Sequence, residues 1–221
     1  MKKESKICYI VGAGEFRKDV FHPEEGAYII AADGGYAYLK ELGIEPDMVV
    51  GDFDSLGKRP DHPNVIEHPV MKDDTDLALA AKVAMERGCT ELYFYGATGG
   101  RLDHTIAAMQ LLSGLANQNA AAYLFGEDIK ITALAGGDNS TLHFSGEYEG
   151  TVSVFASCGK AEGVTLEGLL YPLTEAELLP DYTLGVSNSF TGKESRITIK
   201  KGCVWVMWYG NENLPLPTRG K

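Results

Sequence analysis

Pro46-Asp-Met-Val-Val-Gly-Asp-Phe-Asp-Ser55 is an apolar run of strand length that ends in a turn carrying Asp52 and Asp54. The run indicates a short buried strand. Carboxylates at its end put negative charge at the mouth of a fold, which is costly unless a cation or a partner group neutralises it. With one residue between them in an extended segment, both carboxylates point the same way. The pair therefore predicts a Mg²⁺ site, because Mg²⁺ combines few carboxylates with waters and substrate phosphates.

Strand-like and helix-like segments alternate on both sides of this stretch. Strands are expected at 7–11, 28–32, 48–50, 64–67, 92–95 and 121–125, and helices at 35–42, 77–87 and 103–117. Such alternation favours a mainly parallel sheet with right-handed crossovers. We therefore expect residues 1–126 to form an α/β, Rossmann-like domain that carries the nucleotide and metal sites.

The pattern changes near Glu127, where helical periodicity gives way to brief strands split by Gly, Ser, Asn and Asp. These strands are expected at 130–134, 141–144, 152–156, 163–167, 183–186, 196–200 and 204–208, with one short helix at 174–178. Their spacing is typical of an antiparallel β-sandwich or small barrel. We assign a C-terminal antiparallel β-sandwich to 127–212 and a loose C-terminal tail to 213–221.

The composition argues against several classes of binding partner. Among 221 residues, 20 basic and 31 acidic side chains give a net charge of −11, without any block rich in Lys or Arg. That charge argues against nucleic acid or an anionic membrane as partner. No apolar run is long enough to span a bilayer or to serve as a secretory signal, and the four cysteines are widely scattered, so a cytoplasmic protein is expected.

Further acidic and glycine-rich clusters follow other expected strands. In an open α/β sheet, ligands bind beyond the carboxyl ends of the strands, near the point where strand order reverses. The clusters comprise Asp33, Gly34 and Gly35 after the second strand, Asp73, Asp74 and Asp76 beside a helix start, and Gly99, Gly100, Arg101 and Asp103 after the fifth strand. Aspartate also caps helices and turns, and for Asp73, Asp74 and Asp103 that alternative stays open.

Lys72 and Arg101 lie inside these loops and are the expected phosphate ligands, Arg as a planar fork and Lys as a point charge. His104 follows at a helix start, where a backbone contact is an equal alternative to ligand binding. The other four histidines are expected to be surface or packing residues: His22, His62, His68 and His143. No P-loop sequence occurs, and Gly12-Ala-Gly14 lacks the third glycine of a dinucleotide fingerprint.

Five motifs in order resemble those of the thiamine pyrophosphokinase family over nearly the whole chain. They are Ala-Ala-Asp33-Gly-Gly, Pro-Asp-x-x-x-Gly-Asp52-Phe-Asp54-Ser, Lys72-Asp-x-Thr-Asp76, Gly-Gly-Arg101-Leu-Asp103-His and Gly-Val-Ser187-Asn188. The resemblance implies a transferase that moves the pyrophosphoryl group of ATP to the thiamine hydroxyl, giving thiamine diphosphate and AMP. It also implies Mg²⁺, an α/β domain before a β-sandwich, and a homodimer with active sites between subunits.

The resemblance also implies residue roles. Asp52, Asp54 and Asp76 match the magnesium-binding acids. Catalytic roles fall to Asp76, Asp103, Lys72 and Arg101. Contacts to ATP or thiamine are implied for Asp33, Gly34, Gly35, Ser55, Lys72, Thr75, Gly99, Gly100, Arg101, His104, Ser187 and Asn188. Ser187 and Asn188 would meet thiamine from the partner subunit.

The chain departs from the family pattern at one place and leaves two alternatives open. Where the family usually has Gly-Leu-Lys-aromatic, this chain reads Gly168-Leu-Leu-Tyr171, so the Lys of that pattern is absent. The residues alone do not identify the phosphorus that is attacked. A Mg²⁺-dependent phosphohydrolase with the same acids is therefore one alternative, and a non-catalytic nucleotide- or thiamine-binding module is another.

Overall fold

The chain divides into two compact units. The computed structural model describes residues 7–53, 59–67, 74–138 and 140–220. The first unit comprises Met1–Ala108 and Ala122–Glu127, and the second comprises Met109–Ala121 and Asp128–Lys221. Helix α3, Leu102–Ala116, begins in the first unit and ends in the second. In the described part of the chain, no helix has the length and apolar character needed to cross a membrane.

A parallel sheet forms the centre of the first unit. In sheet order its strands are β6 (Ala121–Phe125), β5 (Glu91–Tyr95), β1 (Ile7–Val11), β2 (Tyr28–Ala32), β3 (Met48–Gly51) and β4 (Val65–Glu67). The five strands β1 to β5 pair in parallel. The mainly parallel α/β architecture expected from the alternating segments is therefore confirmed, with strand bounds within one residue of expectation.

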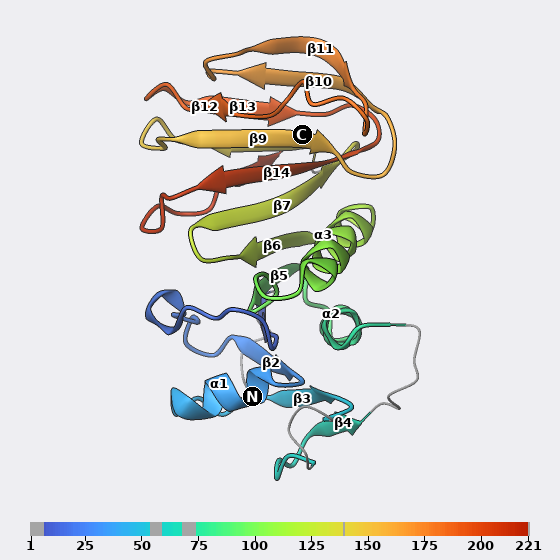
Figure 1. Cartoon of the computed structure of the whole chain (residues 1–221), viewed down its shortest axis with the longest axis vertical. Coiled ribbons are helices and arrows are strands. Elements are labelled where there is room, and N and C mark those ends of the chain that lie inside the picture. Colours follow the sequence, from blue (N-terminus) through green and yellow to red (C-terminus); the bar gives the residue numbers. More distant parts are fainter. Residues whose placement is uncertain (1–6, 54–58, 68–73, 139, 221) are drawn as a thin grey trace. The chain divides into compact units, whose positions relative to one another are not determined.

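Helices cover both faces of this sheet. Helix α1 (Gly35–Glu41) lies on one face and α2 (Asp76–Glu86) on the other (Figure 1), and a short 3-10 turn spans Lys18–Val20. Leu39 of α1 joins a core cluster with Tyr9 and Val11 of β1. Because both faces are buried, the strands read as continuous apolar runs and not as alternating ones.

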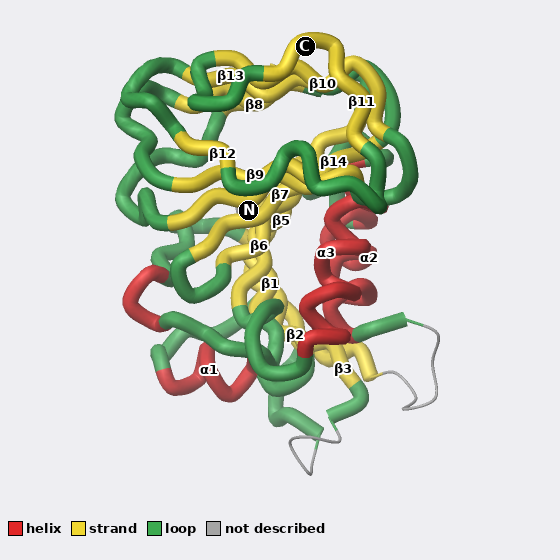
Figure 2. The backbone as a smooth tube through the Cα atoms, turned by 45° about the horizontal axis from the view of Figure 1, so that its top comes forward, coloured by secondary structure: helices red, strands yellow, loops and turns green. Residues whose placement is uncertain are grey.

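The second unit is a β-sandwich of antiparallel strands, whose two layers are visible in Figure 2. One layer contains, in order, β12 (Asn188–Ser189), β9 (Thr151–Ala156), β14 (Cys203–Tyr209) and β7 (Ile129–Ala135). The other contains β11 (Leu173–Leu178), β10 (Ala161–Glu167), β13 (Ser195–Thr198), β8 (Thr141–Phe144) and β15 (Thr218–Gly220). The rings of Phe144 and Trp208 meet edge to face in its core at 5.5 Å. The expected C-terminal β-sandwich is confirmed.

Three local expectations for the second unit are wrong. Residues 174–178 form part of strand β11, because pairing with β10 overrides the helix preference of Glu, Ala and Leu. Residues 183–186 form a turn in which the Val186 N–H donates to the Thr183 carbonyl oxygen at 3.2 Å. The tail is not loose throughout, since β15 pairs with β8 and Arg219 donates to the Ala133 carbonyl oxygen at 3.1 Å.

Candidate functional site

A cavity lies where the strand order of the first unit reverses. The chain proceeds from β1 to β2, β3 and β4 on one side, and β5 then pairs with the other side of β1. Ligands of open α/β sheets bind at such a point, beyond the carboxyl ends of the strands. The cavity has a volume of about 370 Å³. Its lining comprises Gly12, Ala13, Gly14, Ala32, Asp33, Thr75, Asp76, Leu77, Gly96, Ala97, Thr98, Gly99, Gly100, Arg101, His104 and Ala108.

Glycines bring the loops after β1 and β5 together in this lining. The Gly12 N–H donates to the Tyr95 carbonyl oxygen at 2.8 Å, and the Gly14 N–H donates to the Gly96 carbonyl oxygen at 2.7 Å. A Cβ atom on Gly12 would lie only 2.6 Å from the Gly96 oxygen, so any larger residue would push the loops apart. Gly12 and Gly14 therefore serve close backbone approach.

Glu15 fastens the same two loops. Its N–H donates to the Thr98 carbonyl oxygen at 2.9 Å, and its Oε1 accepts from the Gly100 N–H at 3.3 Å. A Cβ on Gly99 would lie 2.2 Å from the Glu15 carboxyl carbon, and Gly99 has a φ of +77°. Any other residue at this position would be strained by the positive φ and would displace the Glu15 side chain.

Two helices begin at the cavity. Thr75 caps α2, its Oγ1 accepting from the Ala78 N–H at 3.2 Å, and Thr75 and Asp76 both line the cavity. Arg101 and His104, at the start of α3, line it as well. The first N–H groups of a helix lack partners inside the helix and carry its positive dipole end, which favours anions. The arrangement suits phosphate groups.

Two carboxylates from separate elements belong to the lining. Asp33 lies between β2 and α1 with a φ of 47°, a left-handed conformation that Asp tolerates, and its N–H donates to the Val50 carbonyl oxygen at 2.8 Å. Asp76 comes from the first turn of α2. Carboxylate oxygens are the donors that Mg²⁺ accepts, so their chemistry fits a magnesium site. Within the described ranges, no group of three or more His, Cys, Asp or Glu side chains could hold a metal ion.

Arg101 and Asp103 are paired with each other. Arg101 Nη2 donates to Asp103 Oδ2 at 2.6 Å, and the His104 N–H donates to Asp103 Oδ1 at 3.1 Å. The hydrogen bond from Arg101 lowers the pKa of the Asp103 carboxyl, and the same contact raises the pKa of Arg101. Both side chains are more than half exposed, so the pair can open toward a phosphate.

The remaining predicted residues of the first unit are placed as follows. Gly35 lies against β1, where a Cβ would come within 1.9 Å of the Val11 carbonyl oxygen, and Gly34 precedes it at the start of α1. Asp52 follows β3, is half-buried and does not belong to the cavity lining. Asp54, Ser55, Lys72 and Asp73 lie outside the described residues.

Ser187 and Asn188 belong to the second unit. Asn188 is buried and holds Tyr171: its Oδ1 accepts from the Tyr171 N–H at 2.9 Å, and its Nδ2 donates to the Tyr171 carbonyl oxygen at 2.7 Å. Ser187 is exposed and has a φ of 57°. Tyr171, at the place where the chain departs from the family pattern, is 62% exposed and is therefore available to a ligand.

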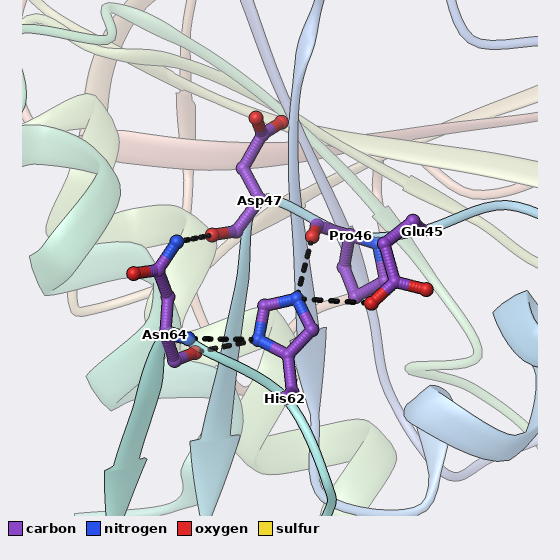
Figure 3. A network of polar contacts seen from close by, with 5 residues as sticks. All are labelled: Glu45, Pro46, Asp47, His62 and Asn64. Atoms are coloured by element: carbon purple, nitrogen blue, oxygen red, sulfur yellow. Dashed lines mark hydrogen bonds and ion pairs between the residues drawn. The ribbon is translucent and has the colours of Figure 1, made fainter.

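Part of the cavity lining was not among the site residues expected from the sequence. The omitted lining residues are Gly12, Ala13, Gly14, Ala32, Leu77, Gly96, Ala97, Thr98 and Ala108. Gly12 and Gly14 carry a usable signal, since they directly follow the first expected strand, although they do not complete a dinucleotide fingerprint. His62, expected to be a surface or packing residue, is a packing residue: its side chain is only 2% exposed, and both ring nitrogens have polar contacts, which Figure 3 shows.

Comparison with known proteins gives concordant matches. A family model described as "Thiamin pyrophosphokinase, catalytic domain" matches residues 23–124, and one described as "Thiamin pyrophosphokinase, vitamin B1 binding domain" matches residues 139–204. A thiamine pyrophosphokinase from Bacillus subtilis (strain 168) is 27% identical over 187 residues, which cover 82% of this chain and 86% of the relative.

Solved structures agree with these matches. The crystal structure of thiamine pyrophosphokinase from Bacillus subtilis has a TM-score of 0.81 and 26% identity, covering 93% of this chain and 99% of that one. The thiamin pyrophosphokinase structure from Geobacillus thermodenitrificans has a TM-score of 0.78 and 27% identity, covering 93% of this chain and 98% of that one. The similarity thus extends over both units.

Proposed function

Since the chain belongs to the thiamin pyrophosphokinase family, we propose that it transfers the pyrophosphoryl group of ATP to the hydroxyl of thiamine, giving thiamine diphosphate and AMP. One observation carries the proposal beyond the family match. The cavity at the strand reversal combines a glycine-rich loop, two helix starts and two carboxylates. Pyrophosphoryl transfer needs this combination, because it depends on positioning and on charge neutralisation more than on covalent chemistry.

The triphosphate is assigned to the glycine loop and the helix starts. The backbone N–H of Gly99 and the N–H groups at the start of α2, after Thr75, would donate to phosphate oxygens. Arg101 lines the same cavity, and its guanidinium has N–H donors besides those of Nε and Nη2 that bind Asp103. Lys72 is proposed to bind phosphate beside it. Together these groups would stabilise negative charge on the transferred group.

The metal is proposed to be Mg²⁺, held by Asp52, Asp54 and Asp76 with Asp33 close by. Support comes from the donor chemistry, since Asp33 and Asp76 line one cavity and offer the hard oxygen atoms that Mg²⁺ takes. When bound, Mg²⁺ supplies positive charge that neutralises the triphosphate. That charge also explains how a protein with a net charge of −11 can accept an anionic nucleotide.

The reaction is a displacement at the β-phosphorus. The thiamine hydroxyl oxygen forms a bond to that phosphorus, and the bond from the phosphorus to the bridging oxygen of AMP breaks. The hydroxyl proton passes to a carboxylate, for which Asp76 and Asp103 are the two candidates. Asp76 lines the cavity directly, whereas Asp103 becomes available when Arg101 turns from it to a phosphate.

Thiamine is proposed to bind to the second unit. The protein is proposed to form a homodimer and to act in the cytoplasm. The match to the vitamin B1 binding domain covers residues 139–204, which include Tyr171, Ser187 and Asn188. Asn188 fixes Tyr171, whose exposed ring offers a face for stacking. Thiamine is itself a cation, so the acidic protein attracts it electrostatically.

The test is product identification after incubation with ATP, thiamine and MgCl₂. The proposal predicts AMP and thiamine diphosphate in equal amounts, with AMP formed only when thiamine is present. Release of inorganic phosphate at the same rate with and without thiamine would instead identify a phosphohydrolase. Binding of both substrates without turnover would identify a non-catalytic module.

A further inference from the structure

The loop after β5 has a backbone that needs support from the rest of the fold. Gly99 and Gly100 follow one another with φ values of 77° and 61°, and both line the cavity at the strand reversal. Glycine loses more conformational freedom on folding than any other residue, so fixing two adjacent glycines in one conformation is entropically costly. Contacts from outside the loop are therefore needed to hold it in the shape that a phosphate would meet.

Glu15 supplies such contacts on both sides of Gly99. Its N–H donates to the Thr98 carbonyl oxygen at 2.9 Å, and its Oε1 accepts from the Gly100 N–H at 3.3 Å. Between these hydrogen bonds the side chain passes over Gly99, since a Cβ there would lie 2.2 Å from the Glu15 carboxyl carbon and 2.5 Å from its Cγ. Glu15 does not belong to the cavity lining, so it holds the loop without occupying the space for a nucleotide.

The backbone of Glu15 is itself anchored by its two neighbours. On one side, the Gly14 N–H donates to the Gly96 carbonyl oxygen at 2.7 Å. On the other side, the Phe16 ring stacks on the Tyr38 ring of α1, with the ring centres 5.2 Å apart. The Glu15 side chain therefore starts from a fixed point, which lowers the entropy lost when it forms its hydrogen bond.

We propose that Glu15 is a positioning residue for the nucleotide, since it fixes the conformation in which Gly99 and Gly100 meet the triphosphate. The inference rests on the proposed function. Glu15 engages the Gly100 N–H, and the lining residues Gly99 and Arg101 then supply the donors for phosphate oxygens. Such support raises affinity, because the loop does not have to become ordered when the nucleotide binds.

Charge and geometry predict opposite effects for the loss of this side chain. A carboxylate beside a triphosphate repels it, so electrostatics alone would make Glu15→Ala bind the nucleotide more tightly. Positioning predicts weaker binding, because the apparent dissociation constant rises as the fraction of molecules with a correctly shaped loop falls. The direction of the change therefore distinguishes the two effects.

The direct test is binding of α,β-methylene-ATP in the presence of MgCl₂, measured by isothermal titration calorimetry. We expect Glu15→Ala to raise the dissociation constant roughly ten-fold. Glu15→Gln keeps an oxygen acceptor without the charge and should bind at least as tightly as the wild type. Glu15→Asp keeps the charge on a shorter side chain and should also weaken binding, so it carries the test if Glu15→Ala does not fold.

Glu25→Ala is the matched control. Glu25 is exposed in the turn before β2 and does not belong to the cavity lining. Its substitution changes the net charge of the protein as Glu15→Ala does, but nucleotide affinity should stay at the wild-type value. In steady-state kinetics, Glu15→Ala should raise the KM for ATP and leave the KM for thiamine near wild type, a split that general destabilisation would not produce.

Hydrogen–deuterium exchange separates failure of this inference from failure of the proposed function. Without ligands, Glu15→Ala should speed amide exchange in peptides covering 96–101 and leave those covering 129–135 near wild type. Unchanged or tighter nucleotide binding in Glu15→Ala, together with faster exchange in 96–101, would overturn the positioning role and leave the function intact. Absence of α,β-methylene-ATP binding by the wild-type protein would overturn the proposed function itself.

Discussion

Asp76 is the residue on which the proposed chemistry depends most directly among those the structure describes. It begins α2, lines the cavity and lies beside the Thr75 cap. Asp74, two residues earlier, is exposed and does not belong to the lining. The two acids therefore provide a matched pair in one segment, one expected to act on the substrate and one not.

Asp76→Asn should reduce kcat by about a thousandfold, because an amide cannot replace the carboxylate at the metal or accept the hydroxyl proton. Asp74→Asn should retain wild-type turnover. Steady-state rates of AMP formation at saturating ATP and thiamine check both, with circular dichroism to verify folding. Wild-type activity in Asp76→Asn would show that Asp76 neither binds the metal nor accepts the proton.

The Arg101–Asp103 pair makes a prediction about pH. Because the contact with Arg101 lowers the pKa of Asp103, the pair's stabilising effect is present at neutral pH and is lost as pH falls through that lowered pKa. Arg101→Gln should therefore raise the pKa of Asp103 toward its ordinary value. A carboxyl-carbon NMR titration of both proteins measures the shift, and an unchanged Asp103 pKa would show that the pair does not persist in solution.

At the scale of elements, the cavity depends on the close approach of the loops after β1 and β5. The backbones of Gly12 and Gly96 are in contact there. The Glu15 side chain lies beside Gly99, and its carboxylate accepts a hydrogen bond from the Gly100 N–H. The sequence placed these loops correctly at strand ends. It did not show that they touch, because contact between residues about 85 positions apart depends on the pairing of β1 with β5 and not on local pattern.

Gly12→Ala should weaken ATP binding and destabilise the protein by roughly 1–3 kcal/mol, since the new methyl group would lie 2.6 Å from the Gly96 oxygen. Gly114→Ala is the control: within α3 its Cβ would meet nothing within 4 Å, so it should stabilise by about 0.5–1 kcal/mol. Denaturant unfolding and the KM for ATP measure both effects. Equal stability of the two variants would show that the loops do not approach as closely as described.

The elements themselves were largely predictable, and the failures have physical causes. In the first unit, burial of both sheet faces gave clear apolar runs, and Gly88 marked the end of α2. In the second unit, Glu175 adopts a φ of 51° within β11, whose pairing with β10 is irregular. There the pairing outweighs the helix propensity of the residues. β15 carries almost no apolar signal, because its three residues, Thr218–Gly220, are held by their backbone pairing with β8.

For the whole molecule, the proposed function assigns the nucleotide to the first unit and thiamine to the second. The cavity with its helix starts belongs to the first unit, and the segment around Tyr171 and Asn188 belongs to the second. The change of pattern near Glu127 lies close to the boundary between Glu127 and Asp128 that separates the two compact units. For the site, the sequence predicted Asp33, Asp76 and Arg101, because acids and bases at strand ends are a local signal.

The division of tasks predicts separable kinetic effects. Asn188→Ala removes the two side-chain hydrogen bonds that fix Tyr171, so the KM for thiamine should rise about ten-fold while the KM for ATP stays near wild type. Initial rates with each substrate varied in turn provide the measurement. If only the KM for ATP rose, thiamine would not bind beside Tyr171 and Asn188.

The proposed reaction is attack by the thiamine hydroxyl on the β-phosphorus of ATP in the first unit's cavity. It is tested most directly with ATP that carries ¹⁸O in the bridge between the α- and β-phosphorus. Mass spectrometry after incubation with thiamine and MgCl₂ should find the label in AMP and none in thiamine diphosphate, with no AMP formed when thiamine is omitted. Formation of ADP, or of labelled products without thiamine, would contradict the claim.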